Sequence, residues 1–119
     1  MKNKNILFMC VANSARSQMA EGIAKKLYPN CTIQSAGSVP KEVNPNAILV
    51  MGEIDIDISK HYSKDFESLD NKFRGFMTDT SINRIKWFST ALILSGILLT
   101  NLNAYPYNII IHGTGAVGW

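Results

Sequence analysis

Residues 5–37 read NILFMCVANSARSQMAEGIAKKLYPNCTIQSAG, and this stretch decides the fold. Residues 5–9 form a short run that is apolar from Ile6 onward, which is typical of a parallel strand buried on both faces. Residues 17–28 repeat apolar side chains at helical spacing, and residues 31–35 are a second strand candidate before a turn. A strand, a helix and a strand within about 30 residues predict a βαβ unit with parallel strands and a right-handed crossover. The expected apolar face of the helix consists of Met19, Ala20, Ile23, Ala24 and Leu27.

The loop between the first strand and the helix carries a cysteine and an arginine at its two ends, Cys10 and Arg16. The first backbone N–H groups of a helix have no partner inside the helix, and together with the helix dipole they attract anions. A loop that wraps around such a helix start forms a nest for an oxyanion. The nest and the guanidinium both favour the thiolate form of Cys10. Arg16 is suited to hold two oxygens of a phosphate at once.

These residue types predict a nucleophile and an anion clamp around one oxyanion. Asn13 suits a left-handed turn inside the loop, and Ser17 is placed to donate its hydroxyl to the thiolate. A second interpretation stays open, in which Cys10 is a small buried hydrophobic residue that ends a strand and Arg16 is a solvated helix residue. The position of the pair at a strand-to-helix junction, with Ser17 directly after it, favours the oxyanion loop.

Four segments carry a resemblance to a known family: the loop CVANSARS, the helix SQMAEGIAKKL, the turn at residues 35–37 and the segment VNPNAILVMGEIDIDISKHYSK. Over residues 4–66 the chain resembles the low-molecular-weight protein tyrosine phosphatases and the similar thioredoxin-coupled arsenate reductases. The resemblance implies a four-stranded parallel sheet flanked by helices, with Cys10 as the nucleophile and Arg16 as the residue that binds phosphate or arsenate. It also implies that the oxyanion is held by Cys10, Val11, Ala12, Asn13, Ser14, Ala15, Arg16 and Ser17.

The chain departs from this family in the groups that complete each reaction. The family phosphatases use the aspartate of a late Asp-Pro pair as general acid, and no Asp-Pro occurs in this sequence. The reductases pass oxidation to two further cysteines in their late half, whereas Cys31 is the one cysteine here besides Cys10. Cys31 falls on the expected second strand, where it is a core residue. We therefore predict a phosphatase-like oxyanion-binding domain with a cysteinyl-phosphate mechanism and impaired catalysis.

Two alternatives to this function stay open. One is an arsenate reductase-like protein, and the other is a non-catalytic oxyanion-binding or interaction module held at a membrane. The expected ligands are phosphate or arsenate, and a phosphotyrosine protein is a possible substrate. Neither a metal nor an organic cofactor is expected.

The rest of the chain predicts an α/β fold with only a partial parallel sheet. Asn44-Pro45 opens a second helix with the proline at its first position. Residues 52–59 alternate isoleucines with acids, which fits either a strand or a short extended loop. Nothing after Leu69 reads as the third and fourth strands of the family. The first strand then lacks a partner on its second edge, which invites self-association and suggests a fragment, a fusion or a frameshift product.

Charge and hydropathy divide the chain. Its 12 Lys and Arg and 9 Asp and Glu all lie in residues 1–86, and the net charge of +3 is too weak to argue for nucleic acid. We expect an incomplete phosphatase-like domain over residues 1–70, a basic linker over residues 71–84 and a hydrophobic tail over residues 85–119.

The tail is expected to anchor the chain in a membrane. The 21 residues from Ile85 to Tyr105 span roughly 30 Å as a helix, which matches a bilayer core. Residues 108–119 read as a truncated second membrane segment. Basic residues before the tail outnumber acidic ones, so the positive-inside rule places the N-terminal domain in the cytoplasm. If the tail does not insert, the protein is cytoplasmic and the tail is a buried helix.

Overall fold

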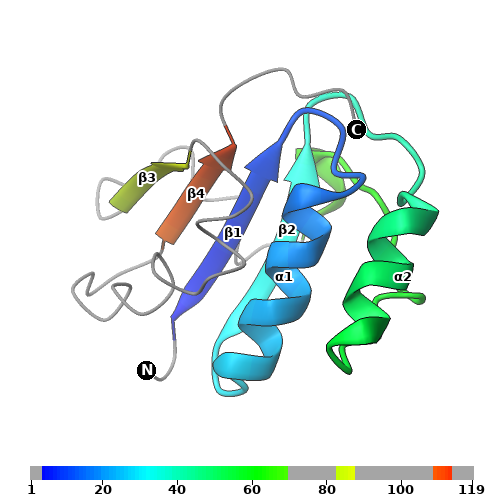
Figure 1. Cartoon of the computed structure of the whole chain (residues 1–119). Coiled ribbons are helices and arrows are strands. Elements are labelled where there is room, and N and C mark those ends of the chain that lie inside the picture. Colours follow the sequence, from blue (N-terminus) through cyan, green and yellow to red (C-terminus); the bar gives the residue numbers. More distant parts are fainter. Residues whose placement is uncertain (1–3, 70–82, 88–108, 114–119) are drawn as a thin grey trace.

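The computed structural model describes residues 4–69, 83–87 and 109–113 (Figure 1). Four parallel strands form one sheet in the order β2-β1-β4-β3. Helix α1 covers one face of the sheet in front of β1 and β2, and α2 lies beside α1 (Figure 1). The elements in chain order are β1 (Asn5–Cys10), α1 (Arg16–Leu27), β2 (Thr32–Gly37), α2 (Pro45–Glu53), the short 3-10 helix η1 (Phe66–Ser68), β3 (Asn83–Trp87) and β4 (Ile109–Gly113).

The predicted βαβ unit is confirmed by β1, α1 and β2. The two strands are parallel, with Asn5 opposite Thr32 and Cys10 opposite Gly37. Residues 6–8 have no exposed surface, as expected for a strand covered on both faces. Four residues of the predicted helix face are buried, but Leu27 is 51% exposed. Leu27 is the last residue of α1, and at this end the apolar face of the helix no longer packs against the core.

Helix α2 begins as its sequence predicts. Asn44 is the N-cap residue, and its side chain accepts a hydrogen bond from the backbone N–H of Asn46 at 2.8 Å. Pro45 occupies the first helical position. Residues 52 and 53 belong to α2, and the chain forms no strand from residue 54 to residue 65, so the loop interpretation of residues 52–59 holds only from residue 54 onward. Ile58 of this loop is completely buried and belongs to the same core cluster as α1.

The expectation of a partial sheet is wrong. Strand β4 pairs in parallel with the second edge of β1, with Ile6 opposite Ile109, and β3 pairs with β4. Residues 109–111 have no exposed surface. A short run of isoleucines suits a buried strand as well as a membrane segment, and hydropathy alone does not separate the two. Because β4 occupies that edge of β1, the predicted self-association through an unpaired edge loses its basis.

The C-terminal segments expected in a membrane also contain strands. Residues 85–87, the expected start of a transmembrane helix, lie in β3, and residues 109–113 of the expected second segment form β4. Residues 88–108 lie outside the described residues. Among the residues that the structure describes, no helix is both long and apolar enough to cross a bilayer. The location of the chain in the cell stays a prediction.

Candidate functional site

The loop that follows β1 lies at the carboxyl edge of the parallel sheet, where open α/β sheets place their ligand sites. Cys10 is the last residue of β1 and Arg16 is the first residue of α1. In the described part of the chain, no side chain caps the N-terminus of α1. The first backbone N–H groups of a helix have no acceptor within the helix, and the helix dipole makes that position favourable for an anion.

The loop residues differ in exposure. Cys10 and Ala12 are half-buried and Val11 is exposed, whereas residues 13–17 are buried. Arg16 keeps only 8% of its surface exposed. The interpretation of Arg16 as a solvated helix residue is therefore wrong. Cys10 is neither fully buried nor apolar in its contacts, so it is not a hydrophobic end of the strand.

Asn13 turns the loop back toward Cys10. Its φ of 48° lies in the left-handed region, as the sequence predicts. In this conformation the backbone N–H of Asn13 donates a hydrogen bond to the Cys10 Sγ at 3.0 Å. The turn thus directs a main-chain donor at the sulfur.

The carbonyl groups of loop residues 11–14 are all bonded to segments outside the loop. In a trans peptide the C=O and the following N–H point in opposite directions, so the N–H groups of residues 12–15 are directed into the loop. The bond from the Asn13 N–H to the sulfur agrees with this. The loop is therefore a nest of main-chain donors. The Val11 carbonyl accepts from the N–H of Val39 at 2.8 Å, the Ala12 carbonyl from that of Lys41 at 2.9 Å, and the Ser14 carbonyl from that of Asn44 at 2.8 Å. The Asn13 carbonyl accepts from the side chains of Gln18 and Ser63.

Ser17 gives the sulfur a second donor. The Cys10 Sγ and the Ser17 Oγ are 2.9 Å apart. The Asn13 Nδ2 donates to the same Ser17 Oγ at 2.8 Å, so the Ser17 oxygen is an acceptor on that side. The hydroxyl proton of Ser17 is then free to point at Cys10, as the sequence predicts. The Cys10 sulfur is thus the meeting point of two donors, one from the main chain and one from a side chain.

The orientation of the Asn13 amide is fixed by two further donors. Its Oδ1 accepts hydrogen bonds from the backbone N–H of Lys64 and from the Gln18 Nε2, each at 3.0 Å. The opposite orientation of the amide would place an NH₂ group against these two donors, so it is excluded. The assignment of Ser17 as donor to Cys10 therefore rests on contacts from outside the loop.

Residues 61–64 form a brace, that is, a segment whose hydrogen bonds support the loop from behind. No pattern in the sequence indicated that this segment supports the site. Ser63 donates from its hydroxyl to the Asn13 carbonyl, and Gln18 donates to the carbonyl of Tyr62 at 3.0 Å. The carbonyl of Lys64 accepts from the N–H of Gly37 at 2.9 Å, which ties the brace to the end of β2. These contacts join positions up to 51 residues apart, so no local pattern indicates them.

Gly37 lets the loop pack directly on the end of β2. A Cβ at this position would lie 2.5 Å from the Val11 carbonyl oxygen and 2.8 Å from the Asn13 backbone nitrogen. Both are main-chain atoms, so neither is free to rotate away. Any larger residue here would displace the nest.

A buried carboxylate lies beneath the brace. Glu21 of α1 is 3% exposed, and its Oε1 accepts a hydrogen bond from the Ser35 hydroxyl at 2.8 Å. Its Oε2 accepts from the Lys25 Nζ at 2.9 Å, and the Lys64 Nζ lies 3.7 Å from Oε1. Burial alone would raise the pKa of Glu21, but the charges of Lys64, Lys25 and His61 outweigh it and hold the pKa below its ordinary value.

His61 connects the charge cluster of Glu21, Lys25 and Lys64 to the loop. Its Nδ1 lies 3.1 Å from the Gln18 Oε1 and 3.3 Å from the Glu21 Oε2. Because the Gln18 Nε2 is occupied as a donor to Asn13, its Oε1 is an acceptor and the His61 Nδ1 carries the proton. Burial lowers the pKa of His61, and the nearby Glu21 offsets only part of this. Burial likewise lowers the pKa of Lys64, again partly offset by Glu21.

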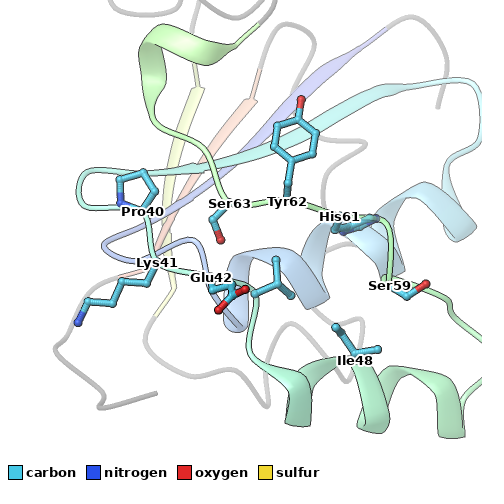
Figure 2. Close-up of a pocket in the computed structure, with 9 residues that line it drawn as sticks. Pro40, Lys41, Glu42, Ile48, Ser59, His61, Tyr62 and Ser63 are labelled. Carbon is cyan, nitrogen blue, oxygen red and sulfur yellow. The ribbon is translucent and has the colours of Figure 1, made fainter.

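Two cavities adjoin the brace. The larger, of about 510 Å³, opens between residues 40–43, Ile48, Ser59 and residues 61–63 (Figure 2). The smaller, of about 130 Å³, is lined by the charge cluster together with Gln34, Lys60 and Tyr62. In the described ranges no group of three His, Cys, Asp or Glu side chains is placed to hold a metal ion.

Cys31 lies away from the loop. It directly precedes β2, is half-buried and packs against the main core cluster. The prediction that it lies on the strand is off by one residue, and its packing against the core agrees with the expected structural role.

Comparisons with known proteins place this geometry in context. The profile of the family described as low molecular weight phosphotyrosine protein phosphatase matches residues 5–74. "Arsenate reductase 2" of Staphylococcus saprophyticus is 47% identical over 73 residues, which cover 60% of this chain and 53% of that protein. The chain spans about half the length of the curated relatives it matches.

Two solved structures share the fold and part of the sequence. "An arsenate reductase in the phosphate binding state" superposes with a TM-score of 0.56 at 36% identity, over 68% of this chain and 58% of that chain. "Vibrio vulnificus Wzb in complex with benzylphosphonate" superposes with a TM-score of 0.50 at 34% identity, over 53% of this chain and 48% of that chain.

Proposed function

The chain belongs to the low molecular weight phosphotyrosine protein phosphatase family, and from this premise we propose that residues 10–17 bind a tetrahedral oxyanion that Cys10 attacks. The observation that carries the proposal is the pair of hydrogen bonds on the Cys10 sulfur, from the Asn13 N–H and from Ser17. They hold a nucleophile at the mouth of a nest of N–H groups. Arg16, at the start of α1, binds two oxygens of the same ion.

We propose arsenate as the oxyanion that is turned over. The curated relatives that are about half identical to this chain over its N-terminal part are arsenate reductases. In this reaction the Cys10 thiolate attacks arsenic and displaces hydroxide, which leaves as water once it takes up a proton. The arsenate ion carries O–H groups of its own at neutral pH, so the proton of the departing water has a source in the substrate, whereas the leaving oxygen of an ester carries no proton and depends on a general acid.

Hydrolysis of a phosphomonoester, with phosphotyrosine as substrate, is the second candidate. It is supported by the family to which the chain belongs and by the likeness to Wzb, which was solved with a phosphonate. Cys10 would attack phosphorus, and water would hydrolyse the cysteinyl-phosphate. The Asp-Pro pair that supplies the general acid in the family phosphatases does not occur in this sequence. Because a missing general acid typically slows such reactions by roughly 10²–10⁴-fold, we expect slow turnover of esters with poor leaving groups.

Three measurements on the purified chain separate these functions, and the first is the formation of arsenite from arsenate in the presence of an added thiol. Calorimetry with arsenate, phosphate and vanadate tests binding, with Arg16→Ala as the site variant and Lys26→Ala, on the exposed side of the same helix, as the control. Release of p-nitrophenol from p-nitrophenyl phosphate at pH 5–6 tests ester hydrolysis. Equal oxyanion affinity of wild type and Arg16→Ala would contradict the site. Binding with neither arsenite formation nor hydrolysis would leave a non-catalytic oxyanion-binding module, the third function that the sequence allows.

A further inference from the structure

The two cysteines of this chain lie at opposite ends of the sheet. Cys10 ends β1 at the carboxyl edge, where its partner in β2 is Gly37. Cys31 directly precedes Thr32, the first residue of β2, which lies opposite Asn5 at the start of β1. The strands are parallel, so the whole length of β2 separates the two thiols.

This separation is too large for a disulfide. At about 3.3 Å per residue, the six steps from position 31 to position 37 put the level of Cys31 roughly 20 Å from that of Cys10. Two cysteines whose Cα atoms are more than about 7 Å apart do not form a disulfide without backbone movement. Here β1 is paired on both edges, with β2 and β4, so that movement would require the sheet to open. Cys31 therefore does not resolve an adduct on Cys10 while the chain is folded, and this chain has no third cysteine.

Resting on arsenate as the oxyanion, we propose that the reaction of this chain is completed by a low-molecular-weight thiol from solution. The Cys10 sulfur is partly buried, because its donors Asn13 and Ser17 have no exposed surface. Cys10 itself keeps partial exposure, and the neighbouring Val11 is 55% exposed. This partial exposure suits attack by a small thiol, which needs little room to reach the sulfur.

The chemistry of this proposal balances. The Cys10 thiolate displaces hydroxide from arsenate, so that a sulfur–arsenic(V) bond forms and water leaves. The thiolate of the small co-substrate then attacks the Cys10 Sγ. A sulfur–sulfur bond forms, the sulfur–arsenic bond breaks, and its electron pair stays on arsenic, which leaves as arsenite. A second molecule of the thiol attacks the co-substrate sulfur and releases the Cys10 thiolate. In total, one arsenate and two thiols give one arsenite, one disulfide and water.

Single turnovers followed by intact-protein and peptide mass spectrometry test this proposal. The chain is mixed with arsenate and reduced glutathione and quenched with acid. We expect one glutathionyl group on Cys10, with arsenite formed in step with it. Cys31→Ser and Cys31→Ala should both form arsenite within about twofold of the wild-type rate, because Cys31 takes no part, and Cys10→Ser should form none.

Several results would contradict the proposal. A Cys10–Cys31 disulfide, or loss of arsenite formation in both Cys31 variants while their circular dichroism stays native, would overturn the proposal. So would arsenite formation with a reduced dithiol protein but not with glutathione. A separate arm tests the function on which this rests: arsenate should protect Cys10 from iodoacetamide without any added thiol. If arsenate protects but no thiol yields arsenite, only the co-substrate is wrong; if arsenate does not protect, the proposed function fails as well.

Discussion

The backbone N–H of Lys64 donates a hydrogen bond to the side-chain oxygen of Asn13 at 3.0 Å, across 51 positions of the chain. This contact decides which way the Asn13 amide points, and hence that its NH₂ group donates to Ser17. Ser17 is then free to donate to the Cys10 sulfur. A brace beyond α2 therefore controls the protonation pattern around the nucleophile.

We expect Asn13→Asp to lower the rate at which Cys10 is alkylated by about tenfold, the loss expected for a hydrogen bond to a charged group. The aspartate keeps the two acceptor contacts and tolerates the left-handed turn. It has no NH₂ group, so Ser17 would donate to it instead of to the sulfur, and its charge adds to the effect. Alkylation with iodoacetamide near pH 6, followed by mass spectrometry, measures the rate.

Two variants separate the causes of this effect. Ser17→Ala removes the same donor without adding charge and should also slow alkylation, whereas Asn30→Asp, at an exposed turn, should not. In all of these proteins Cys10 should react before Cys31, which packs against the core. A wild-type rate in Ser17→Ala would contradict the assigned direction of the hydrogen bond.

We expect Gly37→Ala to weaken oxyanion binding at least tenfold. The added Cβ would lie 2.5 Å from the Val11 carbonyl oxygen, so the nest must shift. Gly52→Ala is the matched control, because a Cβ there meets nothing within 4 Å and lies in α2. It should leave binding unchanged and raise the free energy of unfolding by roughly 0.5–1 kcal/mol, the helical preference of alanine over glycine. Vanadate calorimetry and urea unfolding measure both quantities.

We expect Glu21→Gln to lower the free energy of unfolding by about 3–5 kcal/mol, the cost of breaking a buried ion pair. The variant leaves the Lys64 ammonium, 6% exposed, without its anion. Lys64→Met in the Glu21→Gln background should recover much of this loss, because it removes the unpaired charge. A double-mutant cycle by urea unfolding gives the coupling between the two residues. Additive effects would show that the pair does not interact.

The stability of the protein should fall as the pH is lowered below neutral. The pKa of His61 in the folded protein lies below its ordinary 6.5, so the unfolded chain takes up this proton first as the pH falls through 6.5. The pKa of Glu21 lies below its ordinary 4.5, so the stability it contributes is complete above 4.5 and is lost below that value. Thermal unfolding from pH 8 to pH 2 measures both. In His61→Gln the loss of stability should begin only near pH 4.5, because the histidine no longer contributes. A pH profile of stability equal to that of the wild type would contradict the role of His61.

The part of the site that lies within one short stretch of the chain could be predicted from the sequence. The strand, the nest, the turn at Asn13 and the contact of Ser17 with Cys10 all lie within residues 5–17, where spacing and residue type determine the geometry. The brace at residues 61–64 was not predictable, because its contacts join positions up to 51 residues apart. Strand β4 was missed for another reason. Its isoleucines are buried on all sides, so they lack the alternation that distinguishes a strand from a membrane segment.

The location in a membrane, with the N-terminal part in the cytoplasm, stays a prediction from the hydropathy of residues 85–105. Extraction of membranes with carbonate tests it, because spanning proteins stay in the pellet and peripheral ones are released. Protease added to sealed right-side-out vesicles tests the orientation. Release by carbonate would contradict the membrane anchor.

Ile110→Asp should abolish the cooperative unfolding of the whole chain. Ile110 has no exposed surface, lies opposite Leu7 of β1, and packs with Leu7, Ala36 and Leu69 in the core cluster on that side of the sheet. A carboxylate buried there without a partner costs more than about 4 kcal/mol, which is a large part of the stability of a small domain. Ile54→Asp, at a position 50% exposed, is the matched control and should unfold like the wild type. Near-ultraviolet circular dichroism during thermal unfolding follows both variants. If residues 109–113 were a membrane segment independent of the sheet, Ile110→Asp would leave the unfolding of residues 5–69 unchanged. That result would remove β4 from the fold, whereas loss of the transition makes this strand the partner that completes the sheet beside β1.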